Sequence, residues 1–181
     1  MAADLLSQAE HDKLAAAVLV TTSAQLAEAV RDELERRIPL LPRADIARAS
    51  IDTVGKILLV PDIHAAIDVA NAIAPEHLEV MVDDPFPLLP SIRNAGSVFL
   101  GKYTPEPVGD YFAGTNHTLP TGGSARFASP LSVDDFVKKT SYLYYSKEAL
   151  AEARDKIANF AHREGLDAHA QSVLVRFEEE S

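Results

Sequence analysis

Short apolar runs alternate with amphipathic stretches along the chain as far as Gly101. The runs that are typical of buried strands lie at 15–22, 56–60, 77–82 and 97–101. The stretches that we interpret as helices are 2–13, 23–38, 42–55 and 62–74, with a further short helix within 87–96. Strands that alternate with helices predict an α/β fold, here a partial Rossmann-like parallel sheet flanked by helices.

Residues at the ends of these stretches fit helix boundaries. Ser23 is a favoured N-cap, Asp62 is expected in a first turn, and Gly55 fits the end of the helix within 42–55. Pro75 disfavours the α region for Ala74, so the helix at 62–74 must end there.

The alternation stops after Gly101, in the stretch GKYTPEPVGDYFAGTNHTLPTGGSARF. Ordered loops of this length are uncommon unless they are functional, and the aromatic residues within it argue against disorder. Helical patterning is expected again at 132–145, and 146–165 is strongly amphipathic, with Ser146 as N-cap and Gly165 just past its end. We therefore expect a partial α/β domain at 1–131 and a small C-terminal helical lobe at 132–181, whose SVLVRF segment is a final strand or a helical turn.

The bulk composition narrows the class of protein. The 181 residues suit one domain, or one domain with a small appendage, and carry a net charge of −10. Nucleic acids and anionic membranes require clustered Lys and Arg, so neither is expected as a partner. Cysteine is absent, which excludes disulfides and thiolate sites within the chain. With no apolar run long enough to cross a bilayer and no signal-peptide pattern, we expect a cytoplasmic protein.

Four pairs of polar residues are candidates for chemistry, each beside a plainer alternative. Gln8 and His11 share a helix face at a spacing of three, which suits half of a metal site or an ordinary polar face. Glu76 and His77 open a strand and suit acid–base work, or they lie in a solvated loop. Asp110 and His117 suit a metal site, or they belong to a structural loop. Glu164 and His169 lie on either side of Gly165 and could converge on one site, or they belong to an ordinary helix end.

The remaining histidines, His64 and His162, fall on faces that we expect to be exposed. The sequence has no glycine-rich phosphate loop, no Walker lysine, no H-E-x-x-H and no G-x-S-x-G. Spacing alone therefore supports an α/β protein with a polar or metal site, and nothing narrower.

Five longer motifs occur together in a fixed order: LLSQAEHD, APEHLEV, NAGSVFLGKYTPEPVGDYFAGTNHTLPT, ARFASPLSVDDF and EGLDAH. In this order they closely resemble histidinol dehydrogenase, from about Ala2 to the C-terminus. The family's enzymes are zinc-dependent and oxidise L-histidinol to L-histidine in two NAD-dependent steps, through the aldehyde.

The resemblance implies roles for single residues. One zinc ion per site would be bound by Gln8, His11, Asp110 and His169. Glu76 and His77 would form the catalytic acid–base pair. Substrate contacts would come from the zinc ligands together with His77, His117 and Glu164. The family's intertwined homodimer implies that His169 is donated across the interface.

Members of the family are more than twice as long as this chain. The resemblance places the preceding part of the catalytic domain and most of the NAD-binding region outside it. We therefore expect activity to require a complementing N-terminal half, and we expect exposed apolar surface and weak stability without one.

Two other functions stay open at this point. One is a redox-inactive fragment or regulatory module that binds zinc and an imidazole ligand. The other is a metal-assisted hydrolase in which Glu76 activates water, for which the sequence offers only a carboxylate near the expected metal.

Overall fold

The computed structural model describes residues 1–178, which divide into two compact units, Met1–Phe136 (unit 1) and Val137 onward (unit 2). The strands of unit 1 are β1 (Val18–Thr21), β2 (Lys56–Leu59), β3 (His77–Val80) and β4 (Ser97–Leu100). β1 pairs with β2, and β3 pairs with β4, both in parallel. The predicted α/β class, with parallel strands flanked by helices, is confirmed. Within the described residues, however, the strands form two separate pairs and not one sheet.

The helices of unit 1 are α1 (Ala2–Ala9), α2 (Ala24–Arg37), α3 (Ala44–Thr53), α4 (Ile63–Ile73) and α5 (Glu106–Tyr111). Short 3₁₀ turns lie between them and beyond at Ile38–Leu40, Phe86–Ser91, Ser124–Arg126 and Val133–Phe136. No helix in residues 1–178 combines the length and the apolar character needed to cross a membrane.

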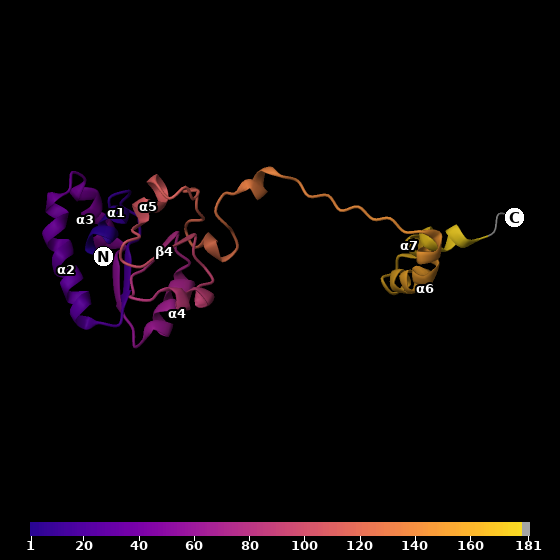
Figure 1. The fold of residues 1–181 in the computed structure, drawn as a ribbon, viewed down its shortest axis with the longest axis horizontal. Coiled ribbons are helices and arrows are strands. Elements are labelled where there is room, and N and C mark those ends of the chain that lie inside the picture. The colour runs from indigo at the N-terminus through magenta and orange to yellow at the C-terminus, as the bar shows by residue number, and fades with distance from the viewer. Residues whose placement is uncertain (179–181) are drawn as a thin grey trace. The chain divides into compact units, whose positions relative to one another are not determined.

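The main apolar core lies where α1, α2 and α3 pack together (Figure 1). Its buried members are Ala2, Leu6, Ala9, Val30, Leu34, Ile38 and Ala47. The helical spacing of the apolar residues in α2 thus marks its buried face. Ser50 of α3 is fully buried, and its hydroxyl donates a hydrogen bond of 2.6 Å to the carbonyl of Ala15.

Side-chain caps begin three of the helices, α2, α4 and α6 (Lys147–Arg163). The Oγ of Ser23 accepts the N–H of Leu26 at 3.2 Å, and the Oγ of Ser146 accepts that of Ala149 at 3.2 Å. Both predicted N-caps are confirmed. Asp62 is itself the N-cap of α4, one position earlier than expected, and accepts the N–H of Ala65 at 2.8 Å.

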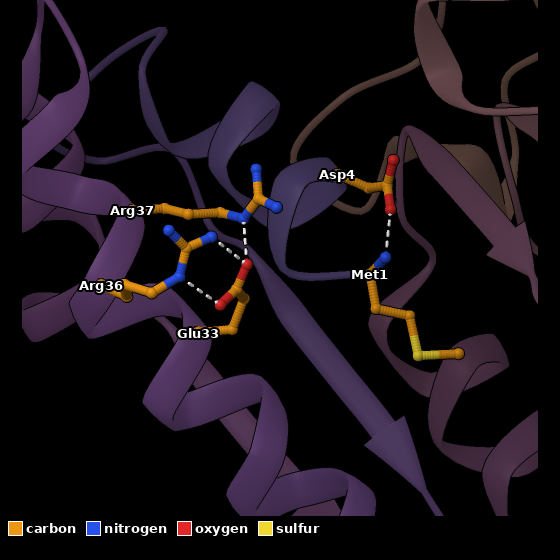
Figure 2. A network of polar contacts seen from close by, with 5 residues as sticks. All are labelled: Met1, Asp4, Glu33, Arg36 and Arg37. Atoms are coloured by element: carbon orange, nitrogen blue, oxygen red, sulfur yellow. Dashed lines mark hydrogen bonds and ion pairs between the residues drawn. The ribbon is translucent and has the colours of Figure 1, made fainter.

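Two groups of ion pairs lie at the start of α1 and at the end of α2 (Figure 2). In the last turn of α2, Glu33 receives two hydrogen bonds of 2.7 Å from Arg36 and a further one from Arg37. These bonds lower the pKa of Glu33 to about 2. The amino group of Met1 pairs with Asp4 in the first turn of α1. Because all these groups are solvated, their contribution to stability is small.

A buried amide joins α4 to the connection that leads into β4. Asn71 is only 5% exposed, and its Oδ1 accepts the N–H groups of Arg93 at 2.7 Å and Asn94 at 3.1 Å. Its Nδ2 donates to the carbonyl of Ser91 at 2.9 Å. This side chain replaces backbone pairing in an irregular segment and fixes the path between β3 and β4.

Four predictions about local structure are wrong. The helix expected at 2–13 ends at Ala9, because Asp12 turns back to accept the N–H of Leu14 at 2.8 Å. The irregular stretch after Gly101 contains the short helix α5. The patterning at 132–145 gives only a 3₁₀ turn, Val133–Phe136, and no regular structure from 137 to 146. The expected helix within 87–96 is a 3₁₀ turn, Phe86–Ser91.

Unit 2 consists of α6 (Lys147–Arg163), α7 (Asp167–Leu174) and a 3₁₀ turn, Val175–Phe177. Gly165 connects the two helices with φ of 73°, a left-handed conformation that glycine adopts without strain, as expected just past a helix end. The SVLVRF segment is helical and not a strand. The contact between the helices rests on small side chains: Ala158, Ala161 and Ala170, with Leu174 beside them.

Candidate active site

The candidate site begins where α4 gives way to β3. Pro75 follows Ala74, which has φ of 53° and is fully buried, so the helix ends at Ile73 and the chain turns sharply. Left-handed backbone is uncommon for a residue other than glycine, and Pro75 disfavours the right-handed alternative. The turn delivers Glu76 just before the first residue of β3, His77.

Helix α5 supplies two carboxylates to the same place. Glu106 and Asp110 are four residues apart, so they share one face of this short helix. Together with His77 they offer one donor atom each, all within 4.8 Å of one another. The Nε2 of His77 is 4.0 Å from the Oε1 of Glu106, and these side chains are only 17% and 13% exposed. The structure therefore brings together the two predicted residues His77 and Asp110.

The surroundings of Glu106 raise the pKa of its carboxyl group. Burial raises the pKa of Glu106 most, and a hydrogen bond with Asp110 and the charges of Asp110, Glu79 and Glu76 bring it to about 7. Two carboxylates share a hydrogen bond only when one of them holds a proton. Burial also raises the pKa of Glu79, while the N–H of Glu106 that it binds lowers it. Glu76 thus lies close enough to act on the same group electrostatically.

The donor set of this cluster fits a divalent cation. One imidazole and two carboxylates match the nitrogen and oxygen ligands that Zn²⁺ accepts. A cation would also relieve the repulsion that raises the pKa of Glu106. Within residues 1–178, no other group of three His, Asp or Glu side chains lies so close together.

The other predicted ligands are placed less compactly. Gln8 lies in α1 and is half-buried, but His11 lies beyond the end of that helix, in an exposed turn where its N–H donates to the carbonyl of Gln8 at 3.2 Å. The interpretation of both residues as one helix face is therefore wrong. The charge of Asp4, one turn before Gln8, contributes to the raised pKa of Glu79, so the start of α1 lies near β3.

The remaining predicted residues are exposed. His117 lies in the irregular stretch after α5. Glu164 is the C-cap of α6 and His169 lies in α7, both in unit 2. His64 and His162 are exposed, as expected, and the Nδ1 of His162 lies 2.8 Å from the Oδ1 of Asp167.

Sequence reasoning missed Glu106. Two prolines and a glycine within PEPVGDY concealed the helix, because each is a poor residue for a helix interior. The available signal was Pro105 and Pro107 at the first positions of a helix, where proline is tolerated, followed by two carboxylates at a spacing of four.

Comparisons with known proteins identify relatives of this chain. A family model described as histidinol dehydrogenase matches residues 1–177. Histidinol dehydrogenase from Bacillus cereus (strain ATCC 10987 / NRS 248) is 55% identical over 180 residues, which are 99% of this chain and 42% of that protein. The one from Caldanaerobacter subterraneus subsp. tengcongensis is 56% identical over 177 residues, 98% of this chain and 41% of that protein.

A solved structure gives the same result. The crystal structure of histidinol dehydrogenase from Elizabethkingia anophelis matches with a TM-score of 0.90 and 38% identity, covering 97% of this chain and 40% of that one. The chain thus spans about two fifths of the length of these relatives. Since the family match covers nearly every residue, the chain belongs to the histidinol dehydrogenase family.

Proposed function

We propose that this chain is the part of a histidinol dehydrogenase that holds the zinc and substrate site for the NAD-linked oxidation of L-histidinol to L-histidine. The observation that supports it most is the convergence of His77 and Asp110, two residues singled out from the family motifs, with Glu106 in a poorly solvated cluster. The relatives are named histidinol dehydrogenase as whole proteins, and this chain matches about two fifths of their length.

Four residues are proposed to bind zinc: Gln8, His11, Asp110 and His169, the last from a second subunit of a homodimer. Amide, imidazole and carboxylate donors suit this metal. Bound zinc would orient the amine and imidazole of the substrate and polarise its oxygen. Substrate contacts are completed by His77, His117 and Glu164.

The proton transfers are assigned to two neighbouring side chains. His77 would accept the proton of the substrate hydroxyl as the carbon-bound hydrogen leaves as hydride, and NAD, when bound, would supply the hydride acceptor. The second oxidation starts from the hydrated aldehyde, and this chain itself offers no thiol that could add to the aldehyde in place of water. Glu76, adjacent to His77, takes the proton from that water.

The position of this pair supports the assignment. His77 is 17% exposed and lies against the ring of Phe99, with 5.9 Å between ring centroids, so its motion is restricted. One well-placed general base contributes about 10²–10⁴-fold in rate.

A complementation experiment tests the function. The 181-residue chain is mixed with the preceding portion of the Bacillus cereus relative, and NADH formation from histidinol is followed with zinc present. We expect activity from the mixture and none from either part. His77→Asn and Glu76→Gln should each reduce the rate at least about 100-fold without changing complex formation. Parts that copurify with zinc bound and stay inert would refute the proposal and favour a redox-inactive module that binds zinc and an imidazole ligand.

A further inference from the structure

Helix α5 lies on the face of the β3–β4 pair that carries His77. Side chains two apart on a strand point to the same face, so Glu79 shares this face with His77. In the parallel register Glu79 lies opposite Phe99 of β4. Both touch α5, Glu79 at its first residue and the ring of Phe99 beside Gly109. The strands therefore hold the helix at two points.

The first turn of α5 has no cap of its own. Pro105 occupies the N-cap position and offers no side-chain acceptor, and Pro107 has no N–H. The N–H of Val108 bonds to the carbonyl of Pro105 at 3.0 Å. The N–H of Glu106 bonds instead to the Oε1 of Glu79, at 2.9 Å. An acceptor from another element thus replaces the missing cap.

This bond matters because α5 has only six residues. A helix of that length is not stable by itself in water. Burying part of the Glu79 carboxylate costs free energy that a hydrogen-bond donor offsets, and the N–H of Glu106 is such a donor. Removing the acceptor leaves a poorly solvated N–H and releases the first turn of the helix.

We propose that Glu79 is a positioning residue: its carboxylate caps α5 from β3 and so holds Glu106 and Asp110 against His77. The consequence for metal binding rests on the proposed function, since it takes Asp110 as a zinc ligand. The capping itself does not depend on zinc. Nothing in this role requires Glu79 to touch metal or substrate.

Two substitutions of Glu79 separate capping from charge. Glu79→Gln keeps a carbonyl oxygen that can accept the N–H of Glu106, whereas Glu79→Leu keeps the approximate size without an acceptor. Glu28→Leu, at an exposed position of α2, is the matched control.

Amide hydrogen exchange and the ring signals of His77, measured by NMR on the metal-free 181-residue chain, form the first readout. In Glu79→Leu we expect the Glu106 amide to exchange about tenfold faster or more, and the ring signals of His77 to move, while amides of α2 stay unchanged. Glu79→Gln and Glu28→Leu should match the unsubstituted chain. An unchanged Glu106 amide in Glu79→Leu, or an equal effect of Glu79→Gln, overturns the proposal.

Zinc affinity, measured by competition with a chromogenic chelator, and the visible spectrum of the cobalt-substituted complementing pair form the second readout. Residues that orient metal ligands are typically worth about 10–100-fold in affinity, so Glu79→Leu should weaken zinc about tenfold and Glu79→Gln much less. Faster exchange with unchanged zinc affinity and cobalt spectrum would make Glu79 merely structural and overturn the positioning role. If the unsubstituted pair takes up no zinc, the proposed function fails, and the exchange and His77 signals decide the role of Glu79 by themselves.

Discussion

Replacing Gly109 by alanine tests how tightly α5 is held on the strands. A Cβ at this position would lie 2.7 Å from Cε1 and 3.0 Å from Cζ of Phe99. The Phe99 ring is only 5% exposed and lies beside His77, so it has little freedom to withdraw. Either α5 lifts from the strands or the ring turns toward His77.

Two opposing terms set the expected magnitude. Alanine is about 1 kcal/mol more favourable than glycine in a helix interior, which stabilises α5. Overpacking a well-packed site costs about 1–3 kcal/mol. Because the closest contact of 2.7 Å involves a buried ring, we place the steric cost near the upper end. The net expectation for Gly109→Ala is a destabilisation of about 1–2 kcal/mol.

Urea unfolding followed by circular dichroism measures this difference, and a double-mutant cycle assigns it. Phe99→Leu removes the ring, so Gly109→Ala should be neutral or stabilising in that background, which corresponds to a coupling of about 1–3 kcal/mol. Zinc affinity should fall in the single variant and recover in part in the double variant. Equal effects of Gly109→Ala in both backgrounds would refute the steric explanation.

Three further expectations concern buried polar groups, and each is checked by urea unfolding. Ser50→Ala leaves the carbonyl of Ala15 without its 2.6 Å partner and should cost about 1–3 kcal/mol, and an effect below about 0.5 kcal/mol would contradict this account. Asn71→Ala removes three hydrogen bonds of a buried amide and should cost about 2–4 kcal/mol, whereas Asn71→Asp, which lacks the donor to Ser91, should regain stability as the pH falls and the acid protonates. Glu106 has its pKa raised from 4.5 to about 7, so the metal-free chain should lose stability as the pH rises through that interval. That loss should be about 1–2 kcal/mol after allowance for solvent access, and Glu106→Gln should abolish it; the same slope in that variant would rule out this carboxyl as the cause.

Local signals predicted much of the fold. Ser23 and Ser146 cap helices as their hydroxyls indicate, and Gly165 connects α6 to α7 in the left-handed conformation. These features depend on residues near in sequence, so the sequence carries them directly. The separation of the strands into two pairs depends on tertiary context, which strand patterns do not contain.

The errors have a similar origin. The stretch at 132–145 carries apolar residues at helical spacing, but Thr140, Ser141 and the tyrosines are weak helix formers. Tyr142, Leu143 and Tyr144 are more than 80% exposed, at 93%, 83% and 88%, so no packing compensates. Helix α5 is the opposite case, because contacts from β3 and β4 support a segment whose own propensity is poor.

The candidate site could be predicted only in part. Motif resemblance named His77 and Asp110, which the structure brings together. It did not name Glu106, because only helix α5 places this residue beside Asp110, and the prolines and the glycine of α5 gave no sign of a helix. The ligand roles of Gln8, His11 and His169, and the roles of His117 and Glu164, stay predictions.

The alanine-lined contact between α6 and α7 has a thermodynamic consequence. Methyl groups bury little apolar area, so the hairpin gains too little free energy from its own interior to offset the entropy of ordering it. Its opening should therefore be frequent. Glu164 and His169 belong to this helical hairpin, Glu164 at the end of α6 and His169 in α7. The predicted roles of these two side chains therefore require conditions that keep the two helices ordered.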